Sequence, residues 1–244
     1  MTDEMHDFLS DARRYFVQQQ DLFGNVLYGD DDMKHQKKTP AATGTGMWSA
    51  YPDEPWVQST TLDELNDQIH ECVKCPLGLT RTKFVFGTGN PQSKVMFMGE
   101  APGADEDAQG EPFVGRAGQL LNKIIEAIGM KREDVYICNI IKCRPPNNRA
   151  PLPVESETCT PYLLKQIELI KPKFIISLGR TAAQWLLQTN DSLGAMRGKT
   201  HDYNGITVIV TYHPAALLRN PEWKRPTWED MKMFKKLYDE AEQH

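Results

Sequence analysis

The chain has 244 residues and a formal net charge of −5, and 40% of its residues are hydrophobic. This length exceeds the usual size of one domain without requiring two complete ones, so one core with an appendage fits best. No apolar run approaches the roughly 20 residues of a membrane-spanning helix. The first residues also lack the basic and then apolar profile of a secretory signal. We therefore expect a cytoplasmic protein rather than a membrane or secreted one.

Residues 1–61 differ from the rest of the chain in charge and in pattern. They hold ten acidic residues against five Lys or Arg, so this segment carries the whole net charge and residues 62–244 are formally neutral. Apolar residues recur loosely at helical spacing from Phe8 to Leu27, and a stretch rich in Lys, Pro, Gly and Thr follows. The sequence predicts an N-terminal helix with a flexible linker over residues 1–61 and a folded domain over residues 62–244.

Short apolar segments alternate with amphipathic ones in residues 62–244. The predicted strands are Lys94–Gly99, Val135–Ile141, Phe174–Leu178 and Thr207–Tyr212. The predicted helices are about Ala117–Ile128, Val154–Ile170, Thr181–Leu187 and Thr227–Ala241, and Thr61 is expected to cap an earlier helix. Because each strand is followed by a helix, we expect an α/β fold of three α/β/α layers with a central four-stranded parallel sheet.

The candidate site begins where the first predicted strand ends. Gly99, Pro102 and Gly103 predict a tight turn there, and Phe113 follows a little later. Four acids lie in this stretch: Glu100, Asp105, Glu106 and Asp107. Asn139 and His213 stand near the ends of two other predicted strands, and open α/β sheets bind their ligands at that edge. A solvated acidic loop is the alternative reading of this stretch.

The five cysteines favour metal binding over disulfides in a reducing compartment. Cys72 and Cys75 form a C-x2-C pair, and Cys143 and Cys159 lie far downstream. Four thiolates can hold either zinc or an iron–sulfur cluster, and the spacing alone does not separate these two. Four unrelated buried thiols remain a third possibility. Cys138 stands among apolar residues of a predicted strand and is expected to belong to the core.

Four motifs together resemble the iron–sulfur (family 4) uracil-DNA glycosylases. They are GEAPG at 99–103, PFVGRAGQLL at 112–121, CNIIKCRPP at 138–146 and HPAALLR at 213–219. The resemblance runs from about Leu62 to the C-terminus and does not include residues 1–61. It implies a DNA-repair hydrolase that flips uracil out of DNA, hydrolyses its N-glycosidic bond and leaves an abasic site. It also implies a [4Fe-4S] cluster held by Cys72, Cys75, Cys143 and Cys159.

The resemblance implies a role for each residue of the uracil pocket. Phe113 would stack on the flipped base, Asn139 would read its edge, and Gly99 and Ala101 would line the pocket. His213 would donate to uracil O2 as the base leaves. The better-known uracil glycosylases carry an Asp in the position of Ala101, so the water-activating base is missing from its usual place.

Two acids and one loop complete the roles that the resemblance implies. Glu100 is expected to orient water or stabilise the sugar cation, and Glu106 to exclude the methyl group of thymine, although these two roles are exchangeable. Leu217, Leu218 and Arg219 would form a wedge that enters the minor groove. No histidine follows the CRPP element closely, so we expect turnover rather than covalent trapping on DNA.

The expected partners are single- and double-stranded DNA that contains uracil, with no membrane and with the protein as a monomer. Scattered basic residues near the predicted loops give this only weak support: Arg116, Lys142, Arg144, Arg149, Arg197, Lys199, Arg219, Lys224 and Arg225. A non-catalytic, cluster-bearing DNA-binding module is the competing class. A zinc-bearing nucleotide-binding protein is disfavoured because neither common glycine-rich phosphate loop occurs. Because every motif lies beyond residue 61, we also expect residues 1–60 to be dispensable for activity.

Overall fold

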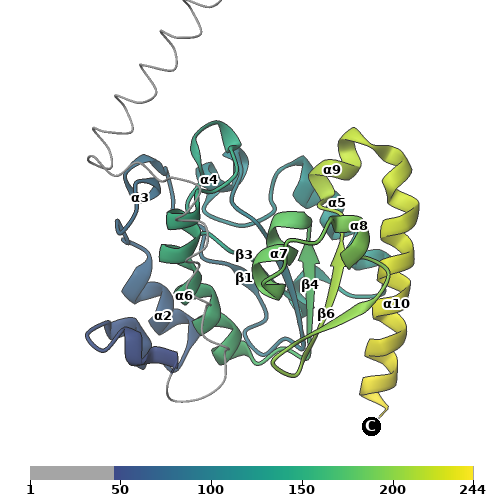
Figure 1. Cartoon of the computed structure of the whole chain (residues 1–244), viewed down its shortest axis with the longest axis horizontal. Helices are drawn as coiled ribbons and strands as arrows, with labels where there is room; N and C mark the ends of the chain where they lie inside the picture. The colour runs from purple at the N-terminus through teal and green to yellow at the C-terminus, as the bar shows by residue number, and fades with distance from the viewer. Residues whose placement is uncertain (1–46, 244) are drawn as a thin grey trace, which may run out of the picture. The chain divides into compact units, whose positions relative to one another are not determined.

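A computed structural model describes residues 47–243, and the four predicted strands form the centre of its sheet (Figure 1). These strands are β2 (Val95–Gly99), β3 (Tyr136–Asn139), β4 (Phe174–Leu178) and β6 (Ile206–Thr211). They are mutually parallel in the order β3-β2-β4-β6. Their carboxyl ends therefore meet at one edge of the sheet, as the sequence predicted.

The expectation of a four-stranded, purely parallel sheet is corrected, because within residues 47–243 the sheet has six strands and is mixed. β1 (Thr88–Gly89) pairs antiparallel with β3, and β5 (Thr200–Tyr203) pairs antiparallel with β6. β1 is only two residues long, too short for a periodic pattern. β5 joins β6 through Asn204 and Gly205, both at positive φ (52° and 83°). Asn-Gly is the strongest short-range hairpin signal, so β5 could have been read from the sequence.

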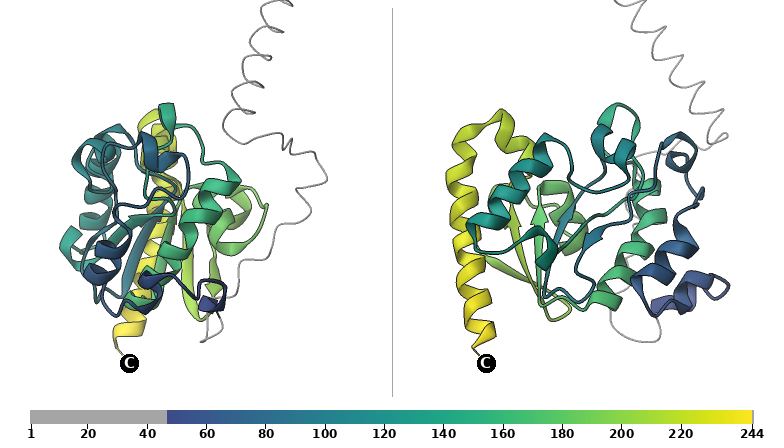
Figure 2. Two further views of the ribbon diagram at one scale, coloured as in Figure 1. Left: turned by 90° about the vertical axis from the view of Figure 1, so that its left-hand side faces the viewer. Right: turned by 180° about the vertical axis from the view of Figure 1, so that it is seen from behind.

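Helices cover both faces of the sheet (Figure 2). Met96 and Met98 of β2 pack in one core cluster, which includes residues of α2 (Leu62–Ile69), α6 (Pro153–Ile170) and α7 (Arg180–Leu187). Val95 and Phe97 point into a second cluster, with α5 (Arg116–Ala127) and α10 (Lys224–Glu242). This alternation is the period of two along a strand that is buried on both faces.

The remaining helical segments are short. They are α3 (Leu77–Thr80), α4 (Ala104–Gln109), α8 (Leu193–Met196), α9 (Pro214–Arg219) and the 3-10 turns η2 (Met47–Ala50), η3 (Pro55–Gln58), η4 (Arg132–Asp134), η5 (Pro146–Asn148) and η6 (Pro221–Trp223). The predicted cap of α2 is confirmed, since Thr61 Oγ1 accepts from Glu64 N at 3.2 Å. Among the described residues, none of the helices combines the length and the apolar character that crossing a membrane requires.

The described part of the predicted linker is packed on the body of the protein. Trp56 is 2% exposed, and its ring lies edge-on to Tyr162 of α6 at 5.2 Å. Trp48 Nε1 donates to Glu168 Oε2 at 2.6 Å. The predicted helix within Phe8–Leu27 lies outside the described residues, and the domain boundary at residue 61 stays a prediction.

Candidate active site

A cavity of about 470 Å³ lies at the edge of the sheet where the parallel strands end. Residues that are distant in the sequence meet there because all four central strands point the same way. Seven of the predicted site residues line this cavity: Glu100, Ala101, Glu106, Phe113, Asn139, His213 and Arg219. The structure therefore gathers most of the predicted pocket into one place.

Asn139 is the last residue of β3 and presents a hydrogen-bond acceptor that has no donor. The residue is 1% exposed, and its Oδ1 atom is buried without a hydrogen-bond partner among the described residues. Leaving such an atom unsatisfied costs about 1–3 kcal/mol, so natural proteins show few of them. The side chain is thus ready to accept a hydrogen bond from an N–H group of a bound molecule.

Gly99 allows Asn139 and Phe113 to approach each other closely. A Cβ atom at this position would lie 2.4 Å from Asn139 Oδ1 and 2.7 Å from Phe113 Cζ. Both distances are far below van der Waals contact, so any larger residue would displace the amide or the ring. Gly99 therefore shapes the pocket without lining it.

Phe113 has a strained backbone that its neighbours hold in place. Its φ of 54° is uncommon for a bulky residue. Arg132 Nη2 donates to the carbonyl oxygen of Pro112 at 2.6 Å, just before it. The backbone N–H groups of Val114 and Gly115, just after it, donate to Glu106 Oε1 at 3.0 and 3.1 Å. Strain of this kind is typical of functional sites, and here it sets the ring of Phe113 at the cavity wall.

The two candidate acids differ in what holds them. Glu106 accepts a third backbone hydrogen bond, from Gly103 N to Oε2 at 3.0 Å, so both of its carboxylate oxygens are engaged by the loop. The side chain of Glu100 lines the cavity and makes no hydrogen bond or ion pair with any described residue. Among the described residues Glu100 thus lines the cavity without a hydrogen-bond partner, whereas Glu106 is bound by the loop that carries Phe113.

His213 lies beside Phe113 with a defined protonation state. Their ring centroids are 5.5 Å apart, and the planes are inclined by 30°. His213 Nδ1 accepts from the backbone N–H of Ala215 at 3.1 Å, so the proton of the neutral ring sits on Nε2. Burial, and secondarily the positive charge of Arg219, lowers the pKa of His213 to about 4. At neutral pH the ring is a neutral donor at Nε2.

The predicted wedge residues face in different directions. Leu217 of α9 is 1% exposed and packs inward, whereas Leu218 is 39% exposed and Arg219 is exposed and lines the cavity. Of these three residues, Leu218 and Arg219 are exposed to solvent. Leu217 anchors α9 to the core.

The four predicted ligand cysteines come from three parts of the chain. Cys72 and Cys75 follow α2, Cys143 follows β3, and Cys159 lies in α6. Hydrogen bonds to these sulfur atoms include Tyr162 Oη to Cys72 Sγ at 3.3 Å, Arg81 Nη1 to Cys143 Sγ at 3.4 Å and Lys142 N to Cys159 Sγ at 3.3 Å. All four are free thiols.

Burial disfavours the charged form of the cysteines in this set, whereas nearby hydrogen-bond donors favour it. Burial is the largest influence on Cys143 and Cys159 and raises their pKa values to about 11 and about 12, and the charge of Cys75 acts on both. Donors near the sulfurs, such as Arg81, suit ligands that carry negative charge. Within residues 47–243 no group of three or more His, Cys, Asp or Glu side chains is arranged to hold a metal ion.

Two of the basic residues that the sequence analysis counted toward DNA are engaged in contacts within the protein. Lys142 is fully buried, and its Nζ donates to Asn139 O at 2.8 Å and to Gln166 Oε1 at 2.5 Å. Arg197 is paired with the buried Asp230 at 2.6 Å. These two residues stabilise the core, and the exposed basic residues lie elsewhere.

Comparison with known proteins places this site in a family. A model described as the Uracil DNA glycosylase superfamily matches residues 86–237, which include every cavity residue named above. The chain belongs to this superfamily. Cys72 and Cys75 precede the matched segment.

Several curated members of the superfamily are similar to the chain over most of its length. A Type-4 uracil-DNA glycosylase of Archaeoglobus fulgidus is 44% identical over 185 residues, which are 72% of this chain and 93% of the relative. The enzyme of the same name from Thermotoga maritima is 44% identical over 184 residues, 74% of this chain and 96% of the relative. That of Saccharolobus solfataricus is 46% identical over 183 residues, 71% of this chain and 85% of the relative.

Tyr212, Trp223 and Arg180 are among the residues that line the glycosylase cavity and that the sequence analysis gave no role. Tyr212 directly precedes His213, so its place at a strand end was a signal that could have been used. Trp223 stands in η6 and belongs to no motif. Only the fold brings it to the cavity.

Proposed function

We propose that this protein removes uracil from DNA by hydrolysing the bond between uracil N1 and C1′ of deoxyribose. The observation that carries the proposal is the buried, unpartnered Oδ1 of Asn139 in a cavity that Phe113 also lines, in a chain of the uracil DNA glycosylase superfamily. The curated relatives that match most of the chain bear the name of this activity.

Base selection follows from the amide of Asn139. Its Oδ1 accepts from N3–H of uracil, and its Nδ2 donates to O4. Cytosine presents the reverse pattern at these two positions, so the same amide meets an acceptor with an acceptor and a donor with a donor. A base that leaves the duplex also loses its stacking, and the ring of Phe113 restores part of it, worth about 1–3 kcal/mol.

Hydrolysis breaks the N1–C1′ bond and joins the oxygen of water to C1′. The electron pair of the broken bond stays on uracil, and His213 Nε2–H donates to O2 of the departing anion. The proton that the attacking water loses ends on the released base, which leaves as neutral uracil. Preorganised donors of this kind typically contribute two to three orders of magnitude in rate. The carboxylate of Glu100 orients the attacking water or stabilises the positive charge on the sugar, and an abasic site remains.

Cys72, Cys75, Cys143 and Cys159 would hold a [4Fe-4S] cluster. When bound, the cluster supplies a covalent tie between the chain after α2, the loop after β3 and helix α6. This tie would fix the loop that begins four residues after Asn139. Reduced thiols require a reducing compartment, which suits the cytoplasm.

The DNA partner is engaged next to the cavity. Leu218 enters the duplex where uracil has left, and Arg219 holds a nearby phosphate. A single strand needs no wedge to expose its bases, so both single- and double-stranded DNA are substrates. One monomer contains all the residues of the site.

The direct test is excision from a single-stranded oligonucleotide that contains one uracil. Incubation followed by hot alkali should cleave the strand at the position of uracil, and a matched strand with thymine or cytosine should stay intact. Glu100→Gln serves as the inactive control. A folded protein that binds the strand without creating alkali-labile sites would support the binding-module alternative.

A further inference from the structure

Arg197, Tyr212 and Trp223 form a three-layer stack at the cavity. The guanidinium of Arg197 lies 4.3 Å from the ring centroid of Tyr212. The rings of Tyr212 and Trp223 are 4.7 Å apart and nearly parallel, at 18°. Tyr212 and Trp223 both line the cavity, and the excision chemistry described above gives neither of them a role.

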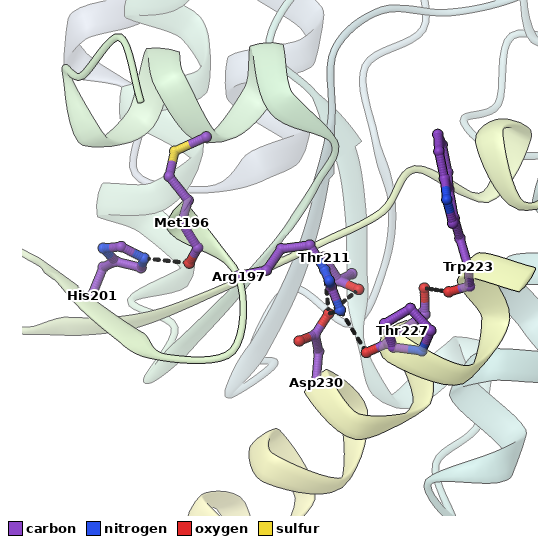
Figure 3. Close-up of polar contacts among 8 residues, drawn as sticks. Met196, Arg197, His201, Thr211, Trp223, Thr227 and Asp230 are labelled. Carbon is purple, nitrogen blue, oxygen red and sulfur yellow. Dashed lines mark hydrogen bonds and ion pairs between the residues drawn. The ribbon is translucent and has the colours of Figure 1, made fainter. Parts of the chain in front are cut away.

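Buried polar contacts fix the base of this stack (Figure 3). Asp230 Oδ2 accepts from Arg197 Nε at 2.9 Å and Nη2 at 2.6 Å, and from Thr211 Oγ1 at 2.7 Å. Arg197 Nη2 also donates to Pro226 O at 2.6 Å, and Thr227 Oγ1 donates to Trp223 O at 2.8 Å. The aromatic rings are therefore ordered before any ligand binds, which lowers the entropic cost of binding.

The surroundings of the stack suit a nucleic-acid strand. Arg180 and Arg219 are exposed and line the same cavity, and exposed Lys224 and Arg225 follow Trp223 directly. Positive side chains beside stacked aromatic rings are the combination that binds single-stranded nucleic acids, because phosphates and base faces are engaged together. Tyr212 is bonded to His213, so a strand with uracil in the pocket passes next to the stack.

We propose that Trp223, supported by Tyr212 and Arg197, stacks on the nucleobase directly next to uracil in the same strand. The inference rests on the proposed uracil excision and assigns the same site a further contact to its DNA. A stacked base contributes enough for an expected loss of about tenfold in kcat/KM on its removal. The effect falls on KM because the contact exists before and during the reaction.

The test combines protein variants with substrates that lack one neighbouring base. Single-stranded oligonucleotides carry one uracil and, directly 5′ or 3′ to it, either a base or a tetrahydrofuran abasic analogue. With the parent protein, one of the two analogues should raise KM about tenfold. With Trp223→Ala the intact strand should already show this raised KM, and the analogue should add nothing. Trp223→Phe should restore most of the difference in KM between the intact strand and the strand that carries the analogue.

Trp228→Ala is the matched control. Trp228 is 41% exposed on α10 and lies outside the cavity lining, so this variant should respond to the analogues like the parent. If Trp223→Ala lost activity by the same factor on every substrate and still responded to the analogue, the stacking subsite would be refuted. If the parent excised no uracil, the proposed function would be refuted. The subsite would then be tested by binding alone, and it would be supported if Trp223→Ala bound a uracil-free strand more weakly than Trp228→Ala. Equal binding by the two would refute it.

Discussion

His213 Nδ1 accepts a hydrogen bond from the backbone N–H of Ala215 at 3.1 Å, and this contact fixes the proton of the neutral ring on Nε2. His213→Ala should lower kcat by about two to three orders of magnitude, because it removes a donor that acts as the base leaves. Binding of abasic DNA should not weaken. Single-turnover rates and product affinity measure the two effects, and equal losses in both would contradict the assignment.

The lowered pKa of His213 predicts how rate and stability depend on pH. With a folded pKa of about 4, the ring stays neutral and donating between pH 5 and 8, so its titration should not shape the rate profile there. The unfolded chain has the ordinary value of about 6.5 and binds the extra proton first. The neutral ring of His213 in the folded protein therefore contributes stability above about pH 6.5, and this contribution is lost as pH falls toward 4. Denaturation of the parent and of His213→Ala at several pH values should differ in this window.

Glu100 and Glu106 should respond differently to the same change. Glu100→Gln should reduce kcat strongly and leave the melting temperature near that of the parent, because the side chain makes no contact that stabilises the fold. Glu106→Gln weakens the acceptor of three backbone N–H groups and should lower the melting temperature, because bonds to a charged acceptor contribute about 1.5–3 kcal/mol each. Calorimetry measures the melting temperatures of the two variants, and single-turnover excision measures their rates. If Glu106→Gln lost activity and Glu100→Gln lost stability instead, the roles of the two acids would be exchanged.

Asn139→Asp should abolish most excision of uracil. The new carboxylate repels uracil O4, and a site built to hydrogen-bond one group rejects a mismatch by a factor on the order of 10² or more. Weak excision of cytosine is the secondary outcome, although a buried unpaired charge disfavours it. Single-turnover assays on strands with uracil and with cytosine measure both. Excision of uracil at the parent rate would overturn the pocket assignment.

The cysteines predict a coloured protein. Anaerobic purification should give a brown protein with broad absorbance near roughly 400 nm, as thiolate-held iron–sulfur centres show. Cys159→Ser should lose the colour, and Cys138→Ser should keep it, since Cys138 is fully buried within β3 and belongs to the hydrophobic core. A colourless parent with one bound zinc would contradict the cluster.

The packing of Trp56 changes the expectation for the N-terminus. The motifs alone predict that residues 1–60 are dispensable. Trp56 is 2% exposed, however, and contacts Tyr162, whose hydroxyl donates to Cys72 Sγ. A protein that begins at residue 47 should match the parent in activity, whereas one that begins at residue 61 should be less stable by about 3–5 kcal/mol, as for removal of a buried Trp. Thermal denaturation and excision assays on both truncations measure this. Equal stability of the two truncated proteins would support the simpler expectation that residues 1–60 are dispensable.

Local features of the chain were enough to predict the four central strands, the longer helices that follow them and seven residues that line the cavity. Each central strand is a short apolar run and each later helix has a periodic pattern, so both are encoded within a few neighbouring residues. The motifs around Gly99, Phe113, Asn139 and His213 named the pocket because parallel strands place their ends together. The two edge strands were missed, one because it is too short and the other although Asn204 and Gly205 marked its turn.

The differences in surroundings between similar residues of the site are visible only in tertiary contacts. Glu100 and Glu106 are both acids after the same strand, and only the amides of Gly103, Val114 and Gly115 engage one of them and leave the other free. Leu217 and Leu218 are adjacent and chemically identical, yet α9 turns one inward and the other outward. Trp223 reaches the cavity because Arg197, Thr211 and Asp230 join segments that are distant in the chain. Such contacts depend on the folded geometry, and no pattern of neighbouring residues records them.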